Sequence, residues 1–247
     1  MEGRLRDGRP EGAGLTQGIK IQDPAAFIRR ETRVKPVPHA EEIRLHLADE
    51  AMGLWQKTED ELGELGLAPP FWAFAWAGGQ ALARYVLDTP DLVAGKSVVD
   101  FACGSGLIGI AALRAGASSC HAVDIDGFAI EAARLNAELN GVSVSVERAD
   151  ITEGDPLETD LFFCGDVFYD KNMADKVLAF LDRTLATGTP VFVGDPGRSY
   201  LPKDRLELLA TYRVPVVGAL EDSEVKKTCV YRLLPKPARD NDCSKAA

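Results

Sequence analysis

The chain has 247 residues, 46% of them hydrophobic and 27% charged, so it can bury a full hydrophobic core. Its formal net charge of -10 disfavours binding to a nucleic-acid backbone, which depends on clustered Lys and Arg. The sequence contains neither an apolar run of about eighteen residues nor a charged-then-apolar leader, which disfavours membrane insertion and secretion. We therefore expect a soluble, cytoplasmic globular protein of the size of an enzyme, for which a basic protein or peptide is the more natural partner.

Cysteine and histidine usage gives no sign of a bound metal. The five cysteines are far apart and form no C-x-x-C pair, so neither a disulfide framework nor a zinc site is predicted. The histidines, His39, His46 and His121, form no metal-like or triad-like group in the sequence. We expect reduced thiols and no metal site.

The two ends of the chain differ in composition from the rest. Residues 1–20 and 236–247 are polar with little apolar periodicity, which predicts a flexible leader and a flexible tail. Residues 21–90 are expected to form an N-terminal extension that packs on the main domain. Within it, the alternation over 42–48 predicts a strand, and 48–66 has the pattern of an acidic amphipathic helix ending at glycine.

Residues 91–235 alternate apolar, β-rich runs with helical segments, the pattern of a parallel sheet covered on both faces. The predicted strands lie at 97–102, 120–125, 143–150, 160–167 and 190–196, followed by a closing antiparallel pair at 213–220 and 225–234. The predicted helices lie at 106–116, 128–141, 173–188 and 204–212. The order predicts an α/β fold, a Rossmann-like doubly wound sheet of seven mostly parallel strands.

A glycine-rich loop joins the first core strand to the first core helix. Gly104, Gly106 and Gly109 have the spacing that lets a ligand approach the backbone and the amide groups of a helix N-terminus. The motif alone serves nicotinamide, flavin and methyl-donor cofactors alike, and it is also compatible with a tight turn that binds nothing.

Carboxylates stand at the ends of three successive predicted strands. Asp100 lies four residues before Gly104, where it would repel a pyrophosphate but accept hydrogen bonds from an ammonium group such as that of S-adenosylmethionine. Asp124 is placed to accept from ribose hydroxyls, a role shared by both cofactor classes. Asp150 is placed to accept from an adenine amino group, with Ile125 and Ile151 as apolar walls. Each acid alone is equally compatible with a helix cap or a loop.

The fourth core strand ends in the sequence GDVFYD, residues 165–170. Asp166 falls at the same edge of the sheet as the other acids, beside the expected position of a donor methyl, and Tyr169 can bring a hydroxyl group to that space. The alternative is that Asp166 caps a helix while Phe168 and Tyr169 are core aromatics.

Together these stretches resemble a known family. VVDFACGSGLIGIAA with AVDID is similar to the class I, seven-stranded S-adenosylmethionine-dependent methyltransferases. Three further stretches narrow the resemblance to the family 16 protein methyltransferases: PPFWAFAWAGGQALARYVLD, GDVFYD and GDPGRSYLP. Within that family, the chain most resembles the lysine methyltransferases of the electron transfer flavoprotein β subunit, including their bacterial relatives. The similarity runs from about Asp23 to Leu234.

The resemblance implies a role for each matching residue. Asp100, Gly104 and Gly106 match the loop around the methionine moiety, Asp124 the ribose carboxylate, and Asp150 the adenine contact. Trp76, just before Gly78 and Gly79, matches an aromatic residue on the cofactor side, and Gly78 is expected to contact the cofactor beside it. Asp166 to Tyr169 match the signature around the target lysine, with Asp166, Phe168 and Tyr169 as catalytic candidates. Arg198 matches a family marker to which the sequence assigns no role.

The implied reaction is protein-lysine N-methylation by a monomer without metal, nucleic acid or membrane, in the cytoplasm of a bacterium or the mitochondrial matrix of a eukaryote. We expect Phe168 and Tyr169 to desolvate the lysine and Asp166 to orient its amine. Two other readings stay open at this point: another protein substrate such as a ribosomal protein, or a small-molecule substrate. A non-catalytic cofactor-binding module is disfavoured because the glycine loop and the Asp166–Tyr169 signature are both whole. A nicotinamide-dependent oxidoreductase is disfavoured by Asp100 and by the lack of a Tyr-x-x-x-Lys set.

Overall fold

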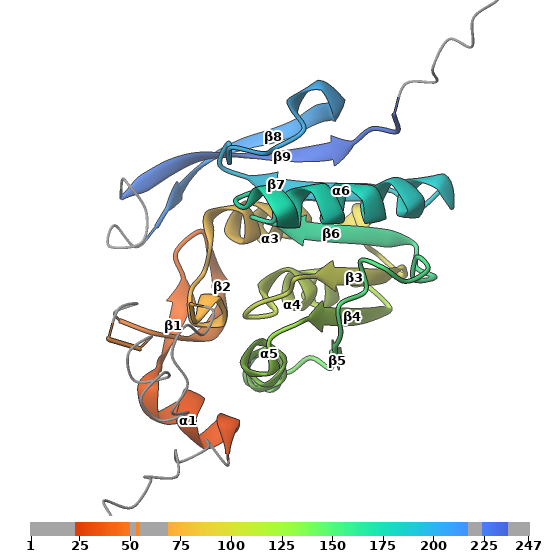
Figure 1. Ribbon diagram of the computed structural model, residues 1–247. Coiled ribbons are helices and arrows are strands. Elements are labelled where there is room, and N and C mark those ends of the chain that lie inside the picture. The colour runs from red at the N-terminus through yellow and green to blue at the C-terminus, as the bar shows by residue number, and fades with distance from the viewer. Residues whose placement is uncertain (1–22, 50–52, 55–68, 217–223, 237–247) are drawn as a thin grey trace, which may run out of the picture.

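Seven strands form a single sheet in the computed structural model, which describes residues 23–49, 53–54, 69–216 and 224–236. The strands are β3 (Ser97–Phe101), β4 (Ser119–Asp124), β5 (Ser145–Arg148), β6 (Leu161–Gly165), β7 (Val191–Asp195), β8 (Leu206–Pro215) and β9 (Val225–Leu233). Their order is β5-β4-β3-β6-β7-β9-β8, and all neighbouring pairs are parallel except β7–β9 and β9–β8, because β9 runs against the other strands (Figure 1). The expected doubly wound, mostly parallel seven-stranded sheet is confirmed.

Helices cover both faces of this sheet. They are α3 (Ala77–Asp88), α4 (Leu107–Arg114), α5 (Gly127–Leu139) and α6 (Lys171–Ala186). Val99 and Phe101 of β3 pack in the core cluster of α6, whereas Val98 packs in that of α3 and α4. Because alternate residues of a strand point to opposite faces, α6 covers one face and α3 and α4 cover the other. A strand buried on both faces is nearly continuously apolar, as β6 is, whereas the apolar run of β3 is interrupted by Asp100.

The segment 204–212 is a strand and not the helix expected from its sequence. After a short 3-10 helix, η3 (Lys203–Arg205), the chain enters β8, which pairs with β9 along its whole length. A bulge between Leu208 and Ala210 adds one residue and breaks the alternation, so the apolar residues take a helix-like spacing. The expected strand 225–234 is confirmed as β9. Its expected partner at 213–220 was placed too late, because β8 ends at Pro215, and 217–220 lie outside the described residues.

The N-terminal part packs on the helices of the core. Helix α1 (Pro24–Glu31) precedes an antiparallel hairpin of β1 (Arg33–Val37) and β2 (Ala40–Leu47), so the strand expected at 42–48 is confirmed. Side chains of β2 bury against α4 and α5. Two 3-10 helices, η1 (Phe71–Ala73) and η2 (Pro90–Leu92), flank α3. Three predicted segments lie outside the described residues: the leader, the tail past 236, and the helix at 48–66 apart from residues 48–49 and 53–54.

Candidate active site

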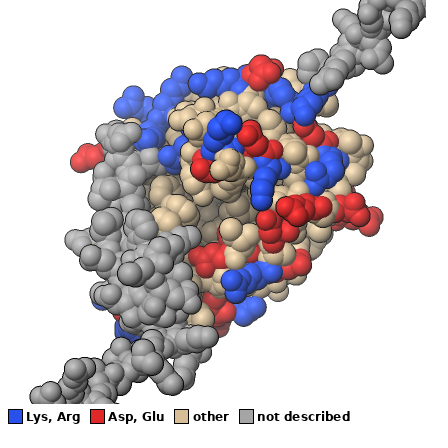
Figure 2. Space-filling model, in the orientation of Figure 1, with Lys and Arg blue, Asp and Glu red and all other residues tan. Residues whose placement is uncertain are grey.

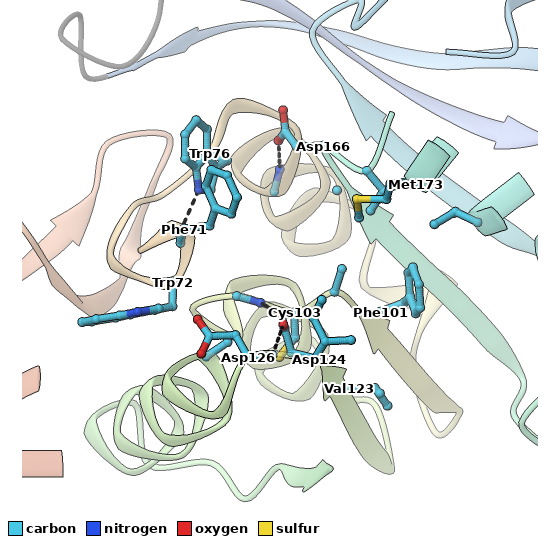
Figure 3. A pocket seen from close by; sticks show the side chains of 18 of the residues that line it. Phe71, Trp72, Trp76, Phe101, Cys103, Val123, Asp124, Asp126, Asp166 and Met173 are labelled. Atoms are coloured by element: carbon cyan, nitrogen blue, oxygen red, sulfur yellow. Dashed lines mark hydrogen bonds between the residues drawn. The ribbon is translucent and has the colours of Figure 1, made fainter. Parts of the chain in front are cut away.

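A cavity of about 570 Å³ opens where the carboxyl ends of β3, β4 and β6 meet. Strands β3 and β6 are neighbours, but the chain leaves β3 toward β4 on one side and enters β6 on the other, so they flank the switch point at which open α/β sheets bind ligands. Figure 3 shows side chains from η1, the glycine loop, β4 and α6 surrounding this space. The candidate site is therefore set by topology.

The glycine loop forms one wall of the cavity. Gly104 and Gly106 have φ of 50° and 76°, a region that disfavours side chains. A Cβ at Gly106 would lie 2.9 Å from Cβ of Ala133, so the loop also needs glycine for its packing on α5. Gly104 lines the cavity, while Gly106 lies behind it as the N-cap of α4.

Two carboxylates stand at the end of β4. Asp124 accepts hydrogen bonds from the amide of Gly104 at 2.9 Å and from the amide of Asp126 at 3.0 Å. Burial raises the pKa of both acids. Asp126 also caps α5 through the amide of Phe128 and lines the cavity, a position that the sequence analysis missed because a helix cap explains it fully. Ile125, expected as an apolar wall, lines the cavity and is 68% exposed.

Asp100 does not line the cavity, in contrast to the expectation that it would meet the ammonium group of a ligand. It is 1% exposed on the α4 side of β3, and its Oδ2 accepts from the amide of Gly109 at 2.8 Å. Its Oδ1 has no hydrogen-bond partner among the described residues. Burial raises its pKa to about 8. Because β3 alternates its side chains, position 100 faces the helix layer behind the loop and not the rim.

The segment after β5 supplies one of its two expected contacts. Asp150 lines the cavity, and its Oδ1 accepts from the hydroxyl of Thr152 at 2.6 Å. Ile151 was expected as an apolar wall, but it is 8% exposed, packs in the α6 core cluster and does not line the cavity. The neighbouring Ala149 lines it instead.

Three aromatic rings gather on the wall of the cavity, and Figure 3 shows two of them, Phe71 and Trp76, at the opposite end from the β4 carboxylates. Trp76 donates from Nε1 to the carbonyl of Phe71 at 2.8 Å, and the Phe71 ring lies 5.5 Å from that of Trp76 and 5.7 Å from that of Tyr169. All three rings line the cavity. Phe71 was missed by the sequence analysis, where nothing distinguished it from the other aromatics of its segment.

Asp166 is held by two elements at once. Its Oδ2 accepts from the amides of Gly78 at 2.5 Å and Gly79 at 3.3 Å, at the start of α3. Its Oδ1 accepts from Arg198, at 3.1 Å from Nε and 2.7 Å from Nη2. Asp166 has φ of 58°, which is uncommon for a residue other than glycine and points to a functional constraint. Gly78, expected to contact the cofactor, does not line the cavity and instead orients Asp166.

The expectation that Phe168 narrows the lysine pocket is wrong. The side chain is fully buried in the core cluster beneath α6, and it does not line the cavity. Its neighbours Val167 and Tyr169 do. The sequence does not indicate which of these three side chains faces the cavity. The chain leaves the strand at Asp166, so the alternation of side chains between the two faces of the sheet ends there.

Within the described parts of the chain, no group of three or more His, Cys, Asp or Glu side chains could hold a metal ion, and no helix is long and apolar enough to cross a membrane.

Comparison with known protein families and solved structures shows similarity to methyltransferases. Residues 80–167 match the ribosomal protein L11 methyltransferase (PrmA) family. Among solved structures, a putative RNA methyltransferase from Pyrococcus horikoshii superposes with a TM-score of 0.51 at 16% identity, over 67% of this chain and 88% of that one. Likeness at this identity concerns the fold alone.

Curated relatives match over most of the chain. The electron transfer flavoprotein beta subunit lysine methyltransferase of Xenopus laevis is 40% identical over 77% of both chains. The human protein of the same name is 39% identical over 76% of this chain and 70% of its own. The matches to ribosomal protein L11 methyltransferases are shorter; that of Aeromonas hydrophila is 57% identical over 27% of this chain and 23% of its own. The chain belongs to the family of electron transfer flavoprotein β-subunit lysine methyltransferases.

Proposed function

We propose that this protein transfers methyl groups from S-adenosylmethionine to lysine side chains of the electron transfer flavoprotein β subunit. The observation that carries the proposal is the match to relatives of that name at 34–40% identity over most of the chain. The geometry supports it, because one cavity contains both a rim of hydrogen-bonding groups suited to a nucleoside and an aromatic end suited to a lysine.

The residues on the β4 side fit an adenosine-type methyl donor. Asp124 offers carboxylate oxygens to ribose hydroxyls, and Asp150 and Ile125 offer an acceptor and an apolar surface to an adenine ring. The backbone at Gly104 is open to the methionine end of the donor. When bound, S-adenosylmethionine supplies a sulfonium-activated methyl group, whose carbon bonds to the lysine nitrogen while the carbon–sulfur electron pair returns to sulfur.

The aromatic end fits the lysine. Phe71, Trp76 and Tyr169 present ring faces and edges along which an aliphatic lysine stem can pack, and ring faces also attract a methylated ammonium group. A lysine at neutral pH is almost fully protonated, so it must lose its proton to solvent before its nitrogen can attack. Excluding water from the stem favours the neutral amine. Asp166 borders this end and is the candidate catalytic residue.

The direct test is to incubate the purified full-length chain with labelled methyl donor and purified electron transfer flavoprotein, and to map label by mass spectrometry. We expect label on lysines of the β subunit and none with the Asp166→Asn variant, which should still bind S-adenosylhomocysteine. A wild-type protein that leaves the β subunit unlabelled would overturn the proposal.

Ribosomal protein L11 is the second candidate, favoured by the match at residues 80–167. That match covers the glycine loop and the β4 and β5 edge, which any methyl donor would need, but it ends before Arg198. We therefore rank L11 below the flavoprotein and include it as a parallel substrate in the same assay. We also propose a monomer, located in the cytoplasm of a bacterium or in the mitochondrial matrix of a eukaryote.

A further inference from the structure

The carboxylate of Asp166 is already engaged on both of its oxygens. Two amides at the start of α3 meet Oδ2, and the guanidinium of Arg198 meets Oδ1 at two points. The side chains of Asp166 and Arg198 are only 10% and 19% exposed. Two charge-assisted hydrogen bonds to one oxygen of a largely buried carboxylate form a strong, orienting interaction, in contrast to an exposed surface ion pair.

A second acid fixes the backbone of Arg198. Asp195, at the end of β7, accepts from the amides of Gly197 and Arg198, each at 2.6 Å. Asp195 is 1% exposed, and Gly197 has φ of 94°, which favours glycine and closes the turn tightly. The turn therefore directs the side chain of Arg198 from the end of β7 to Asp166 at the end of the neighbouring β6.

Arg198 also borders the aromatic end of the cavity. Its guanidinium carbon lies 5.9 Å from the centre of the Trp76 ring, and the residue lines the cavity. Among the described residues, the titratable and charged ones that line this space are Cys103, Asp124, Asp126, Asp150, Asp166, Tyr169, Lys176 and Arg198, with Asp195 behind the last. Asp124, Asp126 and Asp150 lie at the ends of β4 and β5. Figure 3 shows the first two across the cavity from Asp166.

We propose that Arg198 is a positioning residue that neutralises Asp166, and that Asp195 sets Arg198 in place, so that the site receives the target lysine as a neutral amine and not as an ammonium ion. The inference rests on the proposed lysine methylation and concerns the same site. A carboxylate without its arginine would attract the protonated lysine and hold it in the form that has no lone pair to donate. With the arginine in place, the Asp166–Arg198 pair has no net charge to offer an ammonium ion.

The test is the pH dependence of the single-turnover rate at saturating substrate and donor, where the acidic limb reports ionisation within the complex. In Arg198→Gln, the uncovered Asp166 should shift that limb to higher pH by about one unit, which is about a tenfold loss of rate on the limb. Arg198→Lys keeps the charge and should leave the limb near its wild-type position, with a lower plateau. The matched control is Arg232→Gln, which breaks an exposed ion pair with Glu207 away from the cavity and should leave the profile unchanged.

A binding measurement gives a second readout without turnover. The quantity is the ratio of two affinities, measured with S-adenosylhomocysteine present: that for the native substrate and that for a substrate in which the methylated lysine is replaced by methionine. In Arg198→Gln this ratio should rise several-fold above its wild-type value in favour of the native substrate. Asp195→Ala should move both readouts in the same direction, whereas Asp195→Asn keeps an acceptor for the two amides and should move them less.

The outcomes separate the two proposals. A wild-type protein that methylates lysine, together with an Arg198→Gln limb at the wild-type pH and an unchanged binding ratio, overturns this inference alone. A wild-type protein that methylates no lysine overturns the proposed function and this inference with it.

Discussion

The backbones of Gly78 and Gly194 are in direct contact where α3 starts beside β7. A Cβ built on either residue would lie 2.1 Å from the carbonyl oxygen of the other. This approach brings the first amides of α3 onto the Asp166 carboxylate, while the amide of Asp166 itself donates to Gly194 at 2.9 Å. The glycine pair therefore sets where Asp166 stands in the cavity.

Replacing Gly78 by alanine should be strongly destabilising. The added Cβ would meet the Gly194 carbonyl oxygen at 2.1 Å and Oδ2 of Asp166 at 2.5 Å. Because the Gly194 backbone cannot rotate away as a side chain can, we expect a loss of about 1–3 kcal/mol in the free energy of unfolding. Gly79→Ala is the matched control, because its nearest neighbour would be a leucine methyl at 3.9 Å. Urea unfolding of both variants checks this, and equal stabilities would contradict the contact.

Asp100 should make the stability of the protein depend on pH. Its pKa is about 8 in the folded protein against an ordinary value of 3.8, so between these values the folded state holds a proton that the unfolded state has lost. The free energy of unfolding should therefore fall as pH rises from about 4 to about 8. The Asp100→Asn variant has no such proton, so its stability relative to wild type should increase over that range.

Chemical denaturation at several pH values measures this difference directly. Other ionisable groups contribute equally to both proteins and cancel. A constant difference between pH 4 and pH 8 would show that the Asp100 carboxyl is not buried as described.

Asp124 should control cofactor affinity. The Asp124→Ala variant removes both the expected ribose contact and the acceptor that holds the Gly104 amide, so binding of S-adenosylhomocysteine should weaken by more than about tenfold. Asp160→Asn is the control, because Asp160 also accepts from a backbone amide, that of Ser97, but lies away from the cavity. Isothermal titration calorimetry compares the two, and similar affinities would remove Asp124 from the site.

Tyr169 should act through its ring. Because the ring packs 5.7 Å from that of Phe71 and is 45% exposed, Tyr169→Phe should keep most of the activity, whereas Tyr169→Ala should lower it by about tenfold or more. Initial rates with saturating donor measure the effect. Equal loss in both variants would assign the role to the hydroxyl group.

Salt should slow the reaction on a protein substrate. The chain carries a net charge of -10, which favours a basic docking partner. Figure 2 shows acidic and basic side chains interspersed on the face that it displays, so we expect a moderate rise in KM between low and physiological ionic strength. Rates that are indifferent to salt would exclude this electrostatic docking.

The periodicity of apolar residues in the sequence was enough to predict most strands and helices of the core. Strand β6 is an apolar run between Asp160 and Gly165, and the helices have clear caps, as at Asp126 and Asp170. The exception is β8, where a bulge disturbs the alternation and the pairing with β9 overrides local preference. Tertiary pairing of this kind has no local signature.

The sequence by itself determined the fold class, the family and the edge of the sheet that carries Asp124, Asp150 and Asp166. It did so because the succession of strands and helices, and the loop motifs between them, can be recognised from local sequence patterns. Only the tertiary structure decided which way individual side chains point. It turned Asp100 and Phe168 away from the cavity and joined Arg198 to Asp166, residues 32 positions apart. Orientation at the end of a strand depends on backbone geometry and packing between distant segments, which no local pattern encodes.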